Sequence, residues 1–346
     1  SGTCTRGRSS PGEGAGHGVW ASGEARPVMR LVWRRLMQSV PLLLVISALV
    51  FFLMRAVPGG PLAAYLENPN VRPEDLERLR VAMGLDAPLG VQYLRWLAAF
   101  VRGDWGYSYA DGRPVLDRVL ERMPATLELV LSSTVLALCL ALPAGMLAAT
   151  RVRADRFTRL LTTAGVSLPV FWLGLVLQLL LSIQLGWLPS SGRQSFGNSS
   201  VGDRVAHLVL PALVLAAVQG AAWTRYLRRA LRDMLALPFL RAARLRGLSG
   251  SRILWRHALP NAVGPFVTVV LLDAAMLASG AVVTESVFAW PGVGSLFTEA
   301  LVKRDYPVLM AFLMLAATAV VVLNLLADLL VQRLDPRTGA RSWERT

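Results

Sequence analysis

The chain has 346 residues, of which 54% are hydrophobic and 17% are charged, and its formal net charge at pH 7 is +14. Soluble domains carry about 25% charged residues, so this composition disfavours a soluble globular enzyme, a disordered protein and a nucleic-acid-binding module. A basic chain this rich in apolar residues more simply places its arginines at a membrane surface.

The N-terminal part divides into a polar tail and an apolar stretch. Residues 1–28 are rich in Gly and Ser and show no apolar period, which predicts a disordered tail. Residues 29–57 supply a basic start and a first apolar run. The run is too long for the core of a signal peptide, and no small-x-small cleavage site precedes Pro58. We therefore interpret it as an uncleaved first span.

Six apolar stretches are long enough to cross a bilayer core of about 30 Å, which takes about 20 helical residues. They are residues 36–57, 126–150, 160–185, 205–226, 263–287 and 306–331. Pro143, Pro169 and Pro211 interrupt the second, third and fourth stretches, where a kink and a static packing feature are both open interpretations. The prediction is an all-α polytopic membrane protein with six transmembrane helices, whose core covers residues 126–338 before a tail at 339–346.

Basic residues indicate which side of the membrane each loop occupies. Residues 1–35, 151–159, 225–257 and 332–346 hold 23 of the 36 Lys and Arg residues. Positively charged loops stay in the cytoplasm, because anionic headgroups and the membrane potential oppose their translocation. This alternation predicts that both termini and the loop at 227–262 are cytoplasmic.

Residues 58–125 are predicted to form an extracytoplasmic helical insertion, since their acidic and basic residues balance. The pieces at 71–85 and 91–101 have helical spacing, and Pro73 followed by Glu74 and Asp75 suits a first helical turn. Two short amphipathic helices near the outer surface are expected. They form either a lid that packs on the spans or a docking surface.

The loop between the fourth and fifth stretches is amphipathic. Its apolar residues recur at helical spacing, at Leu231, Leu235, Phe239, Leu240 and Ala243. This spacing predicts a helix on the cytoplasmic face. Gly247 suits the end of that helix because glycine readily takes the left-handed conformation. A second short helix is expected over residues 252–259, before Pro260.

The same loop resembles the EAA loop of ABC-importer permeases, which forms the coupling helix that sits in a groove of the ATPase subunit. The matching pattern is Arg241-Ala242-Ala243, three residues, Gly247, nine residues and His257-Ala258-Leu259-Pro260. Arg241 stands where that family usually has Glu, and His257 where Ile is common.

The resemblance implies an ATPase-coupling set, which comprises Phe239, Leu240, Arg241, Ala242, Ala243, Arg244, Leu245, Gly247, Leu259 and Pro260. Apolar contact with the partner is expected from Leu240, Leu245 and Leu248. The arginines of this loop would pair with acidic residues of the ATPase or with lipid headgroups.

Four further stretches resemble B-type permease subunits of dipeptide and oligopeptide importers. They are Gly84–Tyr109, Pro114–Leu129, Thr284–Met310 and Leu334–Arg337, so the resemblance covers about residues 30–338. It implies a type I ABC importer permease fold in a bacterial cytoplasmic membrane. The implied substrates are dipeptides or oligopeptides, although relatives carry glutathione, nickel complexes or haem.

The resemblance also implies an assembly of several chains within the lipid bilayer. The expected partners are a homologous C-type permease subunit, two ATPase subunits and an extracytoplasmic substrate-binding protein, and no nucleic acid. The chain is expected to be non-catalytic and to hold no cofactor, with ATP and Mg²⁺ on the partner subunits. Its single lysine, Lys303, lies outside any Gly-Lys-Ser/Thr motif, so the sequence contains no P-loop.

Polar residues inside the spans are candidates for the translocation pathway, because an ionisable group in a membrane typically faces a cavity or a partner. Asp273 is expected near the midplane of the fifth span, with Gly280 and Thr284 on roughly the same face. An interhelical hydrogen bond is the alternative role for Asp273. Glu128 and Glu285 are placed near outer ends, where carboxylates reach water easily and a gate or binding-protein contact is the hypothesis.

Two other classes of function agree less well with the sequence than a permease subunit does. The alternative is a stand-alone secondary transporter or channel for small solutes, but the sequence lacks the twelve-span or inverted-repeat pattern of such proteins. An intramembrane enzyme is disfavoured because Ser132, Ser133 and the three His residues form no paired nucleophile and base. The two Cys and three His residues are too dispersed for a metal site.

Overall fold

The fold is known from a computed structural model that describes residues 25–57, 62, 72–198 and 200–334. Its longer elements are α1 (Ala25–Ala56), α5 (Val115–Thr150), α6 (Val152–Ser167), α8 (Val201–Leu235), α11 (Leu259–Val287) and α13 (Tyr306–Leu334). Its shorter elements are α3 (Pro73–Ala82), α4 (Leu89–Val101), α7 (Val170–Leu177), η2 (Gln178–Gln184), α9 (Pro238–Leu245), α10 (Gly250–Ile253), η3 (Leu254–Ala258) and α12 (Val293–Val302).

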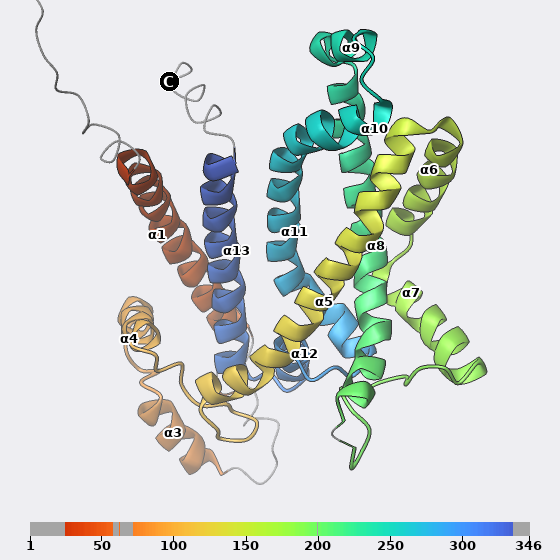
Figure 1. Cartoon of the computed structure of the whole chain (residues 1–346). Coiled ribbons are helices and arrows are strands. Elements are labelled where there is room, and N and C mark those ends of the chain that lie inside the picture. The colour runs from red at the N-terminus through yellow and green to blue at the C-terminus, as the bar shows by residue number, and fades with distance from the viewer. Residues whose placement is uncertain (1–24, 58–61, 63–71, 199, 335–346) are drawn as a thin grey trace, which may run out of the picture.

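The architecture is all-α and membrane-spanning, as predicted. Five of the described helices are long and apolar enough to cross a membrane, and six spans result if α6 and α7–η2 count as one bent span. No β-strand occurs in the part of the chain that the structure describes. Figure 1 shows α9 at one end of the molecule, near the start of α1 and the end of α13, with α3, α4 and α12 toward the opposite end.

The third predicted span is not a straight helix. The axes of α6 and α7–η2 differ by 102°. Pro169 explains the break, because a residue before proline avoids the helical conformation and Leu168 is extended, with φ −85° and ψ 131°. The helices α5 and α8 instead continue through Pro143 and Pro211. Only the proline of the third span therefore separates two helices.

Two predicted boundaries need correction. The helix α1 begins at Ala25, inside the predicted tail 1–28, and Pro27 falls in its first turn, where a helix does not use the N–H group. The helix α5 begins at Val115, inside the predicted insertion 58–125, because Val115 and Val119 are buried against residues of α12 and α13. Predictions for residues 1–24, 58–61, 63–71 and 335–346 lie outside the described residues.

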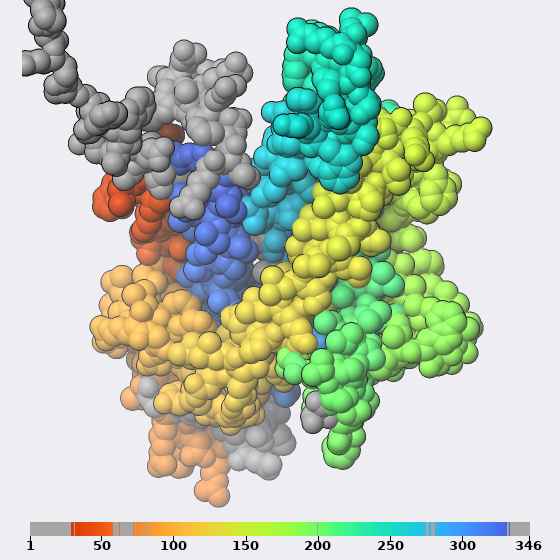
Figure 2. Space-filling view, in the orientation of Figure 1, coloured from red at the N-terminus to blue at the C-terminus, as the bar shows by residue number. Residues whose placement is uncertain are grey.

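The helices α5 and α8 form the most extensive helix pair. Small residues line their contact: Ala137, Ala141 and Ala216 are fully buried, and a Cβ at Gly145 would lie 3.0 Å from Cδ2 of Leu227. Membrane helices associate through such close packing, since lipid offers no hydrophobic drive between them. Figure 2 shows α5, in yellow, running diagonally across the front of the molecule.

Aromatic side chains pack α4, within the predicted insertion, against α1. The rings of Tyr93 and Trp96 on α4 lie 5.6 Å and 5.7 Å from that of Phe51 on α1, measured between centroids. The hydroxyls of Tyr93 and Ser47 are 2.8 Å apart. The helix α4 thus packs on a span, as the lid interpretation expects, whereas docking stays a prediction.

Candidate functional site

The helix α9 is a separate turn-bounded element between α8 and α10. Pro238 occupies its first position, where the missing N–H costs no hydrogen bond. Its end is a Schellman motif, in which the N–H of Leu248 donates to the carbonyl of Ala243 at 3.3 Å and that of Gly247 to Arg244 at 3.1 Å. Gly247 has φ +84°, so the predicted glycine stop of this helix is confirmed.

The apolar residues of this region divide between the chain's own core and the outer surface. Leu240 has no exposed surface and packs in one cluster with Leu231 and Ile253, and Leu248 packs partly against that cluster. The expectation that Leu240 contacts a partner is therefore wrong, since a helix this short needs an apolar anchor in its own chain, whereas a partner contact of the half-buried Leu248 stays a prediction. Phe239 and Leu245 are 53% and 91% exposed.

The remaining residues of the predicted coupling set surround these two. Arg241, Ala242, Arg244, Gly247 and Pro260 are exposed, whereas Ala243 and Leu259 are half-buried. Within the described part of the chain, no ion pair involves the guanidinium groups of Arg241, Arg244 or Arg246. In Figure 2 the segment around α9 projects from the body of the molecule. Its surface therefore offers two large apolar side chains among uncompensated positive charges.

A buried ion cluster that the sequence analysis missed lies at the same end. Asp155 of α6 is 2% exposed and pairs with Arg228 and, at 3.0 Å, with Arg232 of α8. Arg232 also donates to the carbonyl of Ala148 at 3.2 Å, which brings in α5. Asp155 is the only acidic residue in the basic segment 151–159, and that isolation is the signal that could have identified it.

Asp273 lies at the midpoint of α11, and its Oδ2 accepts a hydrogen bond from Nε1 of Trp223 at 2.7 Å. The interhelical hydrogen bond considered as the alternative is thus present. The residue Asp273 is nevertheless only half-buried. Gly280 lies further along the same helix. Thr284 is 1% exposed, and its hydroxyl has no hydrogen-bond partner among the described residues.

Glu285 does not reach water, contrary to the expectation for an outer-end carboxylate. It has no exposed surface, accepts from Oγ1 of Thr126 at 2.7 Å and accepts from the N–H of Ser295 at 2.9 Å. The N–H of Ser295 belongs to the first turn of α12, where a negative charge stabilises the helix. This burial removes Glu285 from the surface, and its hydrogen bonds join α11, α12 and α5, while a gate at this residue stays a prediction.

Glu128 is also paired within the chain. Its Oε2 lies 3.0 Å from Nε of Arg193 and 3.3 Å from Nη2 of Arg204. The carboxylate is 25% exposed. These contacts connect α5 to the loop before α8 and to the first turns of α8.

A third buried carboxylate, after Asp155 and Glu285, connects the segment before α5 to the start of α13. Asp305 has no exposed surface and accepts from the hydroxyl of Ser108 and, at 3.0 Å, from the N–H of Tyr109. The neighbouring Asp111 lies 3.4 Å from Arg118. Burial acts to raise the pKa of Asp111, but hydrogen bonds from Arg113 and Ser108 and the charge of Arg118 hold that pKa below its ordinary value.

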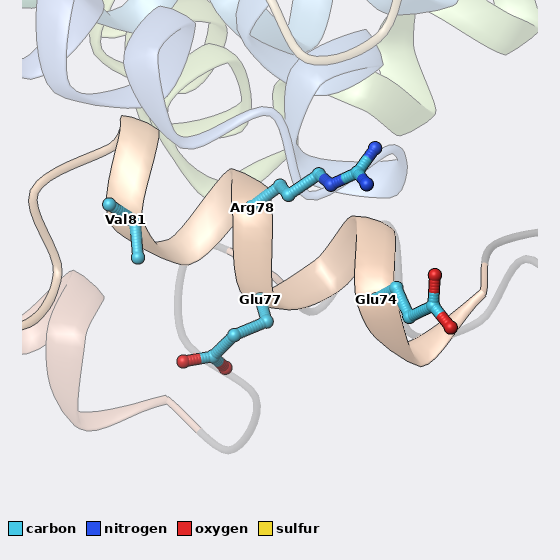
Figure 3. A pocket seen from close by; sticks show the side chains of 4 residues that line it. All are labelled: Glu74, Glu77, Arg78 and Val81. Carbon is cyan, nitrogen blue, oxygen red and sulfur yellow. The ribbon is translucent and has the colours of Figure 1, made fainter.

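A shallow depression along α3 is lined by Glu74, Glu77, Arg78 and Val81 (Figure 3). Its two carboxylates point away from one another, and all four side chains are exposed. This surface brings no reactive groups together.

Substituting Gly292 tests the arrangement around Glu285. A Cβ at Gly292 would lie 2.3 Å from the carboxylate, which is held by its donors and cannot withdraw. We expect Gly292→Ala to lower the free energy of unfolding by about 1–3 kcal/mol. The readout is a lower melting temperature in detergent. Gly202→Ala, in the open first turn of α8, is the control, and an equal effect of both changes would contradict the assignment.

Substituting Gly247 tests whether the Schellman motif at this glycine ends α9. A Cβ there meets no atom within 4 Å, so Gly247→Ala costs only the strain of the left-handed backbone, about 1 kcal/mol. Hydrogen exchange at the amide of Leu248 should then quicken about fivefold. Gly250→Ala, equally open but in α10, should leave that amide unchanged. Unaltered exchange in Gly247→Ala would show that the Schellman motif does not limit this helix.

Two family descriptions match the chain. Residues 141–340 match the "Binding-protein-dependent transport system inner membrane component", and residues 28–130 match the N-terminal membrane component of such systems. The oligopeptide transport system permease protein AppB of Bacillus subtilis (strain 168) is 41% identical over 308 residues, which is 88% of this chain and 97% of AppB. The glutathione transport system permease protein GsiC of Escherichia coli (strain K12) is 35% identical over 311 residues, 89% of this chain and 98% of GsiC.

The fold also matches a solved structure, that of the MetNI methionine ABC transporter in inward-facing conformations. The TM-score is 0.51 at 19% identity, and the match covers 63% of this chain and 96% of the other. At this identity the likeness shows the fold alone, which is that of a type I importer permease. Together with the family matches over both parts of the chain, it places this multi-pass membrane protein in the family of inner membrane components of binding-protein-dependent transport systems.

Proposed function

We propose that the chain is a permease subunit of an ATP-driven importer of dipeptides or oligopeptides. The names of AppB and GsiC, which concern oligopeptides and the peptide glutathione, support this substrate class. A second, homologous permease would complete the translocation pathway. A binding protein on the outer side would deliver the substrate, in keeping with the family description.

The orientation follows from charge. The segments richest in arginine lie around α9, between α5 and α6 and at the start of α1, and positive segments stay on the cytoplasmic side. Figure 1 places the start of α1 and the end of α13 at the α9 end. We therefore assign both termini and α9 to the cytoplasm, and α3, α4 and α12 to the outer side.

The observation that carries the proposal is the exposure of Leu245 and Phe239 on a well-formed helix outside the spans. Large apolar side chains gathered on a protruding element mark a contact with a partner. We assign this surface to an ATPase subunit, with the loop 238–260 as the coupling segment. The neighbouring arginines would meet acidic residues of that partner or lipid headgroups.

The mechanism is alternating access driven from outside this chain. ATP and Mg²⁺ would be bound by the partner ATPases, and this chain would supply no catalytic group. Closure of the ATPase pair would displace α9, and the buried side chain of Leu240 would pass the movement to the cluster that holds Leu231 of α8 and Ile253 of α10. The spans would then move between two packed arrangements as rigid bodies.

Substituting two leucines of α9 distinguishes an effect on ATPase coupling from an effect on the stability of the fold. Leu245→Ala removes an exposed side chain, so the melting temperature should stay unchanged while affinity for the ATPase falls about tenfold and peptide uptake with it. Leu240→Ala empties a buried site and should cost about 2–5 kcal/mol of stability. Both are measured in the purified complex, by thermal melting and by uptake into proteoliposomes. Normal ATPase binding and uptake by Leu245→Ala would refute the coupling assignment.

A further inference from the structure

Asp273 is a charged group at the depth where charge is most costly. It lies halfway along α11, about 21 Å from either end at 1.5 Å per residue. A carboxylate facing lipid at the centre of a bilayer costs several kcal/mol, so such groups face a partner or a water-filled cavity.

The chain gives this carboxylate a hydrogen bond but no countercharge. The donor, Nε1 of Trp223, is neutral and belongs to a side chain with no exposed surface. No Lys, Arg or His of the described residues lies within 4.0 Å of Asp273. By contrast, Asp328 of α13 is paired with Arg35 of α1 at 2.6 Å. Trp223 therefore fixes the position of the Asp273 carboxylate and leaves its charge uncompensated.

An acceptor without a hydrogen-bond partner among the described residues lies on α8, the helix that carries Trp223. Gln219 precedes Trp223 by four residues, so both occupy the same face of that helix. The Oε1 atom of Gln219 is buried and has no hydrogen-bond partner among the described residues. The amide oxygen of Gln219 calls for a hydrogen-bond donor and the carboxylate of Asp273 for a positive charge, and one positively charged donor meets both requirements.

We propose that Asp273 and Gln219 form a site for a primary ammonium group of the substrate as it passes the middle of the membrane. An ammonium has three donors and no acceptor, which suits a carboxylate oxygen and an amide oxygen. The amino terminus or a Lys side chain of a peptide carries this group. The inference rests on the proposed function for its substrate class, and it makes Asp273 a determinant of charge selectivity in the pathway.

The first test compares uptake of two peptides by the complete transporter in proteoliposomes. Ala-Lys-Ala with its amino terminus blocked by a formyl group, and the same blocked peptide acetylated on the Lys side chain, differ by one positive charge and have no other primary ammonium group. Asp273→Asn keeps an acceptor for Trp223 and removes the charge. We expect it to lower the uptake ratio of charged to acetylated peptide about fivefold. Asp328→Asn, which removes a carboxylate that Arg35 already compensates, should leave the ratio unchanged. An unaltered ratio in Asp273→Asn would overturn the proposal.

The second test needs no peptide. Gln219→Cys, with Cys4 and Cys139 replaced by Ser, is treated with cationic and anionic methanethiosulfonate reagents of equal size. The cationic reagent should react faster, and adding Asp273→Asn should reduce the ratio of the two rates about fivefold. Absence of reaction, or a ratio that does not depend on Asp273, would overturn the site. A charge-dependent ratio in a transporter that takes up neither peptide would instead uphold the site and reject peptides as substrates.

Discussion

The carboxylate of Glu285 connects parts of the chain that lie far apart in sequence. It accepts from Thr126, 159 residues away on α5, and from the first turn of α12. Glu285 has no exposed surface, and a carboxylate buried in this way is stable only when its lone pairs are hydrogen-bonded. The glycine at 292 is required because any side chain there would occupy the place of the carboxylate. The start of α12 and the neighbouring parts of α5 and α11 are thereby joined.

At the opposite end, α9 is packed against the body of the chain on one face and exposes apolar side chains on the other. Asp155 and Arg232 tie α5, α6 and α8 together, while Leu240 secures α9 to the same region. The side chains that stay outside, Phe239 and Leu245, belong to that same helix. A force applied to the exposed face of α9 is therefore transmitted to the spans through close packing rather than through a flexible linker.

The acidic residues of the spans differ in how their charge is balanced. Glu128 and Asp328 have arginine partners within the chain, and Glu285 is enclosed by hydrogen-bond donors. Asp273 has one neutral donor at the middle of α11. The distinction between structural carboxylates and one available to a ligand appears only when each partner is identified.

The sequence by itself determined the apolar stretches, the basic end of the molecule and the glycine stop after α9, whereas only the structure showed that Pro169, and not Pro143 or Pro211, separates two helices. Each feature that the sequence determined depends on local properties, namely hydropathy, charge and backbone preference, which neighbouring residues express without the rest of the fold. The tertiary structure alone decided that Leu240 points inward, that Glu285 is sealed and that α5 begins at Val115. These outcomes depend on helices that meet from distant parts of the chain, and a periodic pattern does not specify which neighbour a face will contact.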